Sequence, residues 1–194
     1  MSLKHAILGF LSYTSLSGYD LKKAFDLSVQ HFWPANQSQI YRTLAALNEA
    51  GLVKQEVIER DDRLDLKVYH ITAAGREELH RWLSTPLPAQ DFREPFLIQV
   101  YFAGKLTDEE IVQLLQQQIQ AMEGMMAEYA AAYKSYQDSL DKHEDQRAFF
   151  LSVLTLEYGI TSNLASLDWL KSVAERVESG NYSLREFPLD TYSG

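Results

Sequence analysis

Apolar residues recur at helical spacing in three stretches near the start of the chain, and this pattern predicts three helices over residues 4–11, 17–29 and 36–51. The third helix begins with a capping box, Asn36 with Gln39 three residues later, and its first turns are polar. Its buried stripe has three aliphatic members: Ile40, Leu44 and Leu47. Because one stripe is buried, the opposite face of this helix remains available for contacts.

Two β-type stretches follow the third helix, over residues 52–59 and 66–71, and a charged bend joins them. A helix that is polar at its N-terminus and leads directly into a hairpin is the outline of a winged helix-turn-helix domain with a two-stranded wing. Between the second and third helices, Pro34 breaks the helical pattern. We expect Phe32 and Trp33 to pack beneath the third helix, and Trp82 of a fourth helix to be buried as well.

The prolines at 86 and 88 divide the chain into two domains. We predict a winged helix DNA-binding domain over residues 1–85, a helical dimerisation and possible effector domain over residues 90–180, and a loosely held tail over residues 181–194. The fold class is therefore mainly α.

The second domain has two long helices with apolar residues at heptad spacing. Two such helices do not close a core alone, so a second copy is expected to complete a four-helix arrangement. The residues predicted to form this dimer are Ile119, Met122, Met126, Tyr129, Tyr133, Leu156, Ile160, Leu164 and Leu167. The methionine and tyrosine stripe favours a core or dimer contact first and a ligand pocket second.

The net charge of −9 is unusual for a protein that binds nucleic acid. However, residues 1–85 carry ten basic and ten acidic residues, so all of the excess acidity lies in the second half. The chain has no cysteine and no apolar run long enough to cross a membrane. We therefore expect a cytoplasmic protein without disulfides, thiolate metal sites or a membrane partner.

Several runs of residues make the chain resemble the PadR-like transcriptional regulators. These runs are Ala6–Leu11, Ser17–Leu21, Phe32–Pro34, Ser38–Arg42, Gly51–Val53, Tyr69–Thr72 with Ala74–Gly75, and Trp82–Leu83 in the first half, and Pro95–Leu97 and Leu156–Gly159 in the second. The resemblance implies a dimeric repressor that binds a palindromic operator in double-stranded DNA. It also implies that a small aromatic or hydrophobic effector could relieve repression.

The resemblance also implies a set of DNA-binding residues: Tyr19, Lys22, Lys23, Gln37, Ser38, Gln39, Tyr41, Arg42, Arg60, Arg63 and Lys67. On physical grounds, glutamine suits adenine and arginine suits guanine in the major groove, whereas the lysines and the wing residues suit phosphates. Alternatives remain open. The polar helix face could be merely solvated, the tyrosines could belong to the core, and Arg60 and Arg63 could pair with neighbouring aspartates.

A second function class is an adaptor that uses its winged helix for contact with another protein. An enzyme is not expected, because the chain has no glycine-rich phosphate loop and no nucleophile motif. The five histidines show no metal-ligand spacing, so we expect no metal and no cofactor.

Overall fold

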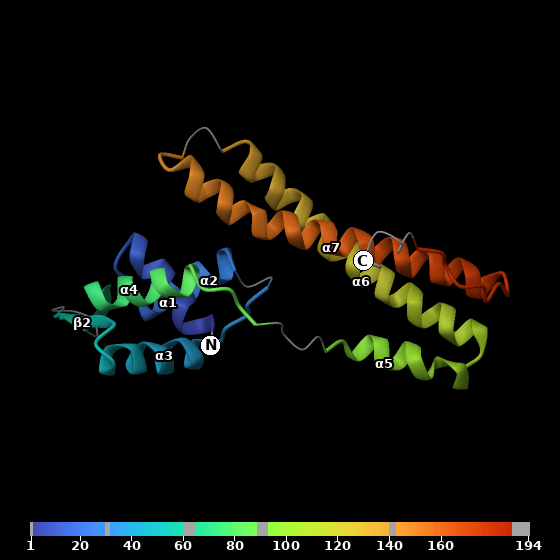
Figure 1. Ribbon diagram of the computed structural model, residues 1–194, viewed down its shortest axis with the longest axis horizontal. Helices are drawn as coiled ribbons and strands as arrows, with labels where there is room; N and C mark the ends of the chain where they lie inside the picture. Colours follow the sequence, from blue (N-terminus) through green and yellow to red (C-terminus); the bar gives the residue numbers. More distant parts are fainter. Residues whose placement is uncertain (1, 30–31, 60–64, 89–92, 140–142, 188–194) are drawn as a thin grey trace. The chain divides into compact units, whose positions relative to one another are not determined.

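The computed structural model describes residues 2–29, 32–59, 65–88, 93–139 and 143–187 of the chain. The chain divides into two compact units, residues 1–91 and residues 92–194, which are considered separately (Figure 1). The predicted architecture, a winged helix-turn-helix followed by a long-helix region, is confirmed.

In its described residues, unit 1 contains four helices and a small sheet in the order expected for a winged helix. Its elements are α1 (Ser2–Tyr13), β1 (Leu16–Ser17), α2 (Gly18–Leu27), α3 (Gln37–Glu49), β2 (Val53–Ile58), β3 (Leu66–Ile71) and α4 (Ala73–Leu83). Strand β3 has the predicted bounds. Gly51 has a φ of 69°, which explains why a glycine ends the third helix.

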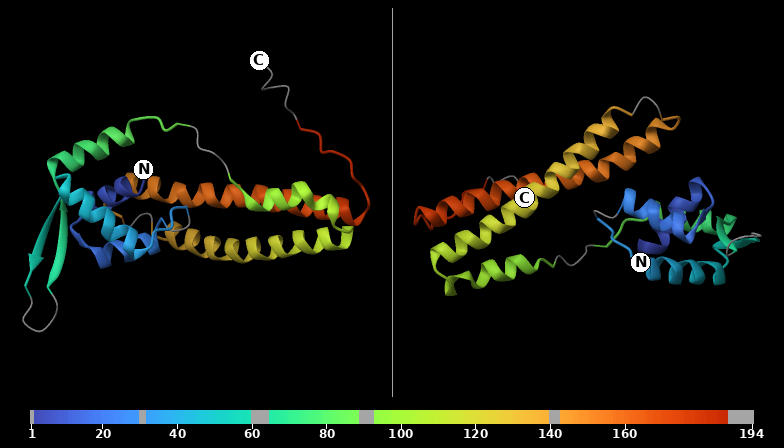
Figure 2. Two further views of the ribbon diagram at one scale, coloured as in Figure 1. Left: turned by 90° about the horizontal axis from the view of Figure 1, so that it is seen from below. Right: turned by 180° about the vertical axis from the view of Figure 1, so that it is seen from behind.

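The sheet has three antiparallel strands in the order β1-β3-β2. Strands β2 and β3 form the predicted two-stranded wing, and the short β1 was not predicted. Leu16 of β1 pairs with Tyr69, which also pairs with Gln55 of β2. A strand of two residues is too short to show an alternating pattern, so the sequence predicts no strand there. Strands β2 and β3 extend away from the helices as the wing (Figure 2).

The core of unit 1 lies between α1, α2, α3 and the near end of the sheet. Its fully buried members include Ile7, Leu8, Leu21 and Phe25 together with the predicted α3 stripe. The expectation for Phe32 and Trp33 is wrong, because these side chains are 50% and 36% exposed and lie beside α1 and α4. The apolar spacing within α2 does not determine the direction of the segment that follows it, so the sequence could not place these two side chains.

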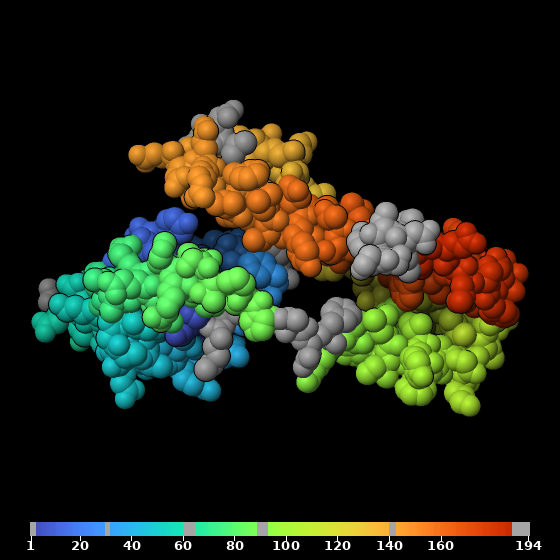
Figure 3. All heavy atoms as spheres, viewed as in Figure 1, coloured from blue at the N-terminus to red at the C-terminus, as the bar shows by residue number. Residues whose placement is uncertain are grey.

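Unit 2 consists of α5 (Pro95–Phe102), a single 3₁₀ turn η1 (Ala103–Lys105), α6 (Asp108–Gln137) and α7 (Gln146–Glu178). Helices α6 and α7 lie side by side along their length (Figure 2). A small core forms where Phe96 of α5 packs against Leu115 and Leu170. Helix α5 lies beside the first part of α6 (Figure 3).

The described part of the predicted tail, residues 181–187, makes hydrogen bonds with both long helices. Tyr182 Oη donates to Asp108 Oδ2 at 2.5 Å, and Arg176 donates to the Ser183 carbonyl at 2.9 Å. The bond to Asp108 raises the pKa of the Tyr182 phenol. In the described parts of the chain, we find no helix with the length and apolar character required to cross a membrane.

Candidate nucleic-acid interface

The first turn of α3 is held rigid by a reciprocal capping box. The Gln39 backbone N–H donates to Asn36 Oδ1 at 2.9 Å, and the Asn36 backbone N–H donates to Gln39 Oε1 at 2.9 Å. Both partners of this box were expected from the sequence. The box satisfies two backbone donors that a helix start otherwise leaves unpaired. The residues of this turn are therefore presented from a fixed backbone.

The face of α3 opposite the core is exposed and polar at its N-terminal end. Gln37, Ser38 and Arg42 are all exposed, and Ser38 and Arg42 lie one helical turn apart. The exposed Ala45 lies beside them and adds little bulk. This surface has the donors and acceptors that base edges require.

The role expected for Gln39 is limited by the capping box. Its side-chain oxygen already accepts a backbone hydrogen bond. A bidentate contact with adenine needs both the oxygen and the amide nitrogen, so Gln39 would have to give up the cap to make it. Gln37 is exposed and does not serve this box, and it is the better candidate for such a contact.

Tyr41 is positioned by the beginning of α2. A Cβ placed on Gly18 would lie 2.5 Å from Tyr41 Cε1, so only a glycine leaves room for this ring. The ring packs on its inner side and remains 40% exposed on the other. Tyr19, the next residue along the chain, is 67% exposed. Neither tyrosine is a core residue, and both phenols are accessible to a phosphate.

The cationic residues proposed for backbone contacts differ in their surroundings. Lys22 forms an ion pair with Asp26 one turn later, whereas Lys23 is exposed on α2. Lys67 is exposed on β3 near the end of the wing. Arg60 and Arg63 lie outside the described residues. Lys54, also exposed on β2, adds a wing cation that the sequence analysis did not select.

A polar network that the sequence analysis missed connects the recognition helix with the wing. Asn48, near the end of α3, accepts a hydrogen bond from the Gln55 backbone N–H at 3.0 Å. Tyr69 Oη donates to Gln55 Oε1 at 3.2 Å across the β2–β3 pair. Burial raises the pKa of the Tyr69 phenol, and the nearby Tyr41 raises it further. No local spacing reveals these residues, because each contact joins different elements.

The residues predicted to form the dimer occupy different positions within unit 2. Leu156 and Leu167 are buried within a single chain, and Ile119 and Met122 pack against its small core. Leu164 is 53% exposed. The others are partly buried: Met126, Tyr129, Tyr133 and Ile160. The exposed apolar residues on α7 also include Phe150, Leu151 and Tyr158, which the sequence analysis did not select.

Two histidines, His5 and His70, form hydrogen bonds between elements. His70 connects Ser15 to Glu56 across the sheet, through bonds of 2.6 and 2.8 Å. Among the residues that the structure describes, no three histidine, aspartate or glutamate side chains are grouped so that they could hold a metal ion.

Comparison with known proteins assigns the chain to a family. The profile of the "Transcriptional regulator PadR-like family" matches residues 7–81, and that of "Virulence activator alpha C-term" matches residues 92–178. A probable transcriptional regulator of Mycobacterium tuberculosis, Rv1176c, is 32% identical over 92% of this chain and 98% of its own length. The chain belongs to the PadR-like family.

Other members of the PadR-like family align over nearly the whole chain. The negative transcriptional regulator PadR of Bacillus subtilis is 29% identical over 91% of this chain and 97% of its own. Its crystal structure with operator DNA has a TM-score of 0.84 at 28% identity, covering 91% of this chain and 99% of that one. A structure of the same protein with p-coumaric acid has a TM-score of 0.77 at 28% identity, with 91% and 95% covered. The family is one of transcriptional regulators.

Proposed function

We propose that this PadR-like protein is a dimeric repressor that binds a palindromic operator. The observation that carries the proposal is the exposed polar face of α3, presented by a capping box on a helix whose other face is fully buried. In helix-turn-helix proteins, the N-terminal part of the recognition helix contacts base edges in the major groove. The B. subtilis relative that was crystallised with operator DNA supports this assignment.

The contacts divide into base readers and phosphate binders. Gln37, Ser38 and Arg42 are the candidates for base edges. Phosphate contacts are assigned to a second set: Tyr19, Lys22, Lys23, Tyr41, Lys67 and the arginines at 60 and 63. Gln39 contributes mainly by capping α3. Residues 1–85, the predicted DNA-binding domain, carry no net charge. Binding therefore depends on where these cations lie rather than on a strongly basic domain.

Dimerisation is proposed to occur through unit 2. The supporting feature is the set of exposed apolar side chains on α7, because soluble monomers seldom expose many large apolar residues on one helix. Since Leu156 and Leu167 are already buried within one chain, the contact with a second copy is assigned to Leu164 and its exposed neighbours. Two copies would place two recognition helices about one turn of DNA apart.

Relief of repression by a small aromatic or hydrophobic effector is part of the same proposal. The relative crystallised with p-coumaric acid supports it, and the name of that relative, a negative regulator, supports repression as the output. A typical coupling of about 1–3 kcal/mol between effector and DNA would lower operator affinity between 5- and 150-fold, on the order expected for allosteric proteins.

The decisive experiment measures binding to a duplex from the region upstream of the protein's own gene and to a scrambled duplex. Arg42→Ala is expected to weaken binding to the first by about 1–3 kcal/mol and to relax preference at one base pair. Lys23→Ala is expected to weaken both duplexes alike and to reduce the dependence on salt, because it removes a phosphate contact. Lys23 is chosen over Lys22 because Lys22 is paired with Asp26.

Equal effects of the two variants on every duplex would contradict this division of roles. Binding that is weak and insensitive to salt would instead favour the adaptor function, in which the winged helix contacts a protein.

A further inference from the structure

One face of the sheet carries both the polar network of the wing and one of its cations. Gln55 is paired with Tyr69, and Lys67 lies two residues before Tyr69 on β3. Because side chains alternate along a strand, all three share one face of the sheet. Val53, two residues before Gln55, lies on this face as well and is buried in the core beneath α3. Lys67 therefore extends from the sheet face that packs toward the recognition helix.

The opposite face of the wing has its own contacts. Lys54 and Glu56 of β2 and His70 of β3 alternate onto that face. The His70 ring lies 2.8 Å from Glu56 Oε2, and His70 is paired directly with Lys54. Both wing lysines, Lys54 and Lys67, are exposed, yet they project from different faces of the same hairpin.

Asn48 ties the wing to the recognition helix from the last turn of α3. Strand β2 lies at an edge of the described sheet, where outward N–H groups have no neighbouring strand. The Gln55 N–H donates instead to Asn48 Oδ1 at 3.0 Å. This bond joins α3 to β2 beyond the turn at Gly51, so it adds a constraint that the chain connection alone does not supply.

The constraint continues from β2 to β3 through the side chain of Gln55. Its Oε1 accepts a hydrogen bond from Tyr69 Oη at 3.2 Å, and Tyr69 is 5% exposed. Burial raises the pKa of the Tyr69 phenol, so the hydroxyl remains a donor at neutral pH. The strand that carries Lys67 is therefore held to α3 by two hydrogen bonds in series.

We propose that Asn48 is a positioning residue that fixes the wing on the recognition helix. Through Gln55 and Tyr69 it sets the distance from Lys67 to the base-reading face of α3, so that Lys67 meets a backbone phosphate. A cation held in place binds a phosphate more tightly than one that must first be ordered. Lys54 lies on the other face and does not share this benefit. The effect on DNA rests on the proposed function, whereas the hold on the wing does not.

Amide hydrogen exchange of the full-length protein without DNA tests the hold on the wing. Asn48→Ala should speed exchange of the Gln55 N–H by roughly three- to tenfold, because the bond that protects it is lost. Tyr69→Phe keeps the buried ring and removes only the second bond, so it should speed exchange in the wing by a smaller factor. An unchanged rate at Gln55 in Asn48→Ala would overturn the proposal.

A double-mutant cycle tests the effect on DNA, with the duplex from the region upstream of the protein's own gene. Lys67→Ala alone should weaken binding by about three- to tenfold and reduce the salt dependence by about one ion. In the Asn48→Ala background, the same substitution should have an effect at least about threefold smaller. Lys54→Ala removes the same charge from the other face and should show no such coupling to Asn48.

Asn48→Asp separates the hydrogen bond from the side chain that makes it. Aspartate keeps an acceptor oxygen for the Gln55 N–H, so slow exchange and the coupling to Lys67 should both be retained. Its negative charge lowers affinity for DNA whether or not Lys67 is present, and the cycle cancels that effect.

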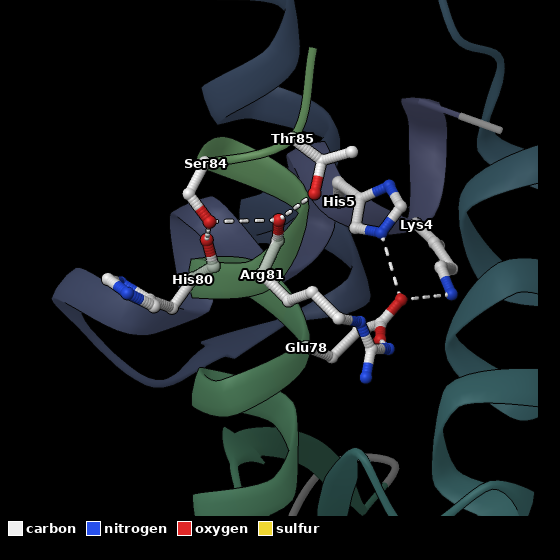
Figure 4. Close-up of polar contacts among 7 residues, drawn as sticks. All are labelled: Lys4, His5, Glu78, His80, Arg81, Ser84 and Thr85. Carbon is white, nitrogen blue, oxygen red and sulfur yellow. Dashed lines mark hydrogen bonds and ion pairs between the residues drawn. The ribbon is translucent and has the colours of Figure 1, made fainter. Parts of the chain in front are cut away.

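A polar cluster elsewhere in unit 1 provides the matched control for lost stability (Figure 4). Glu78 Oε1 lies 2.6 Å from Lys4 Nζ and 3.1 Å from His5 Nε2, and these contacts join α4 to α1. Glu78→Gln should lower Tm by several degrees, because it removes a largely buried charge from its partners. It should leave both the Gln55 exchange rate and the effect of Lys67→Ala unchanged.

The proposal is overturned if Lys67→Ala weakens binding equally with and without Asn48, or if Glu78→Gln reduces the effect of Lys67 as strongly as Asn48→Ala does. A wild-type protein that fails to bind the duplex, while Asn48→Ala still speeds exchange at Gln55, would instead count against the proposed function and retain the hold on the wing.

Discussion

At Gly75 the backbone of α4 approaches the turn that follows the recognition helix. A Cβ at this position would lie 2.1 Å from the Leu52 carbonyl oxygen and 2.8 Å from a side-chain carbon of Ile71. Thr72, the N-cap of α4, donates its hydroxyl to the Gly51 carbonyl at 2.8 Å. No local pattern in the sequence accounts for the glycine, because Leu52 is distant along the chain.

We predict that Gly75→Ala lowers the free energy of unfolding by about 1–3 kcal/mol, because backbone atoms must move to admit the methyl group. Gly124→Ala, where the methyl group meets nothing within 4 Å, should raise it by about 0.5–1 kcal/mol. Urea denaturation followed by circular dichroism measures both. Similar changes in the two variants would show that the close approach to Leu52 is not rigid.

At the scale of elements, capping boxes mark the starts of two helices in the described residues. Asn36 with Gln39 begins α3, and Thr107 with Glu110 begins α6. These boxes depend on residues three positions apart, so they can be read without knowledge of the fold. The hydrogen bond to Thr107 also helps, after the backbone bond, to lower the pKa of the neighbouring Glu109 carboxyl.

Removing each cap separates helix stability from DNA binding. Asn36→Ala should destabilise unit 1 by about 0.5–2 kcal/mol and weaken operator binding, because the first turn of α3 carries the base readers. Thr107→Ala should destabilise unit 2 by a similar amount, about 0.5–2 kcal/mol, and leave DNA contacts unchanged. Hydrogen exchange and filter binding report the two effects. If Thr107→Ala weakens DNA binding as strongly, α3 is not the reading element.

At the scale of the whole molecule, the heptad pattern predicts long helices but not which of their apolar residues remain exposed. Leu156 and Leu164 belong to the same predicted seam, yet one is 5% and the other 53% exposed. The pairing of α6 with α7 uses part of the seam, and the wide apolar stripe leaves the rest on the surface. The proposed dimer contact therefore requires the tertiary structure for its definition.

Leu164→Asp is expected to shift the protein from dimer toward monomer in sedimentation equilibrium, because a carboxylate would be desolvated in the contact. Operator affinity should fall as the dimer dissociates, because a monomer binds only one of the two half-sites. Ser166→Asp adds the same charge at an exposed position two residues away and serves as the control. A wild-type protein that sediments as a monomer would refute the dimer proposal outright.

The sequence by itself determined the helices, their caps, the buried stripe of α3 and the two-part organisation, because these depend on residues close along the chain. Only the tertiary structure revealed strand β1, the packing of Tyr41 on Gly18 and the hydrogen-bond network from Asn48 to Tyr69. It also corrected the position of Phe32 and Trp33, which lie beside α1 and α4. Each of these features joins residues far apart in sequence, and no local spacing encodes such a contact.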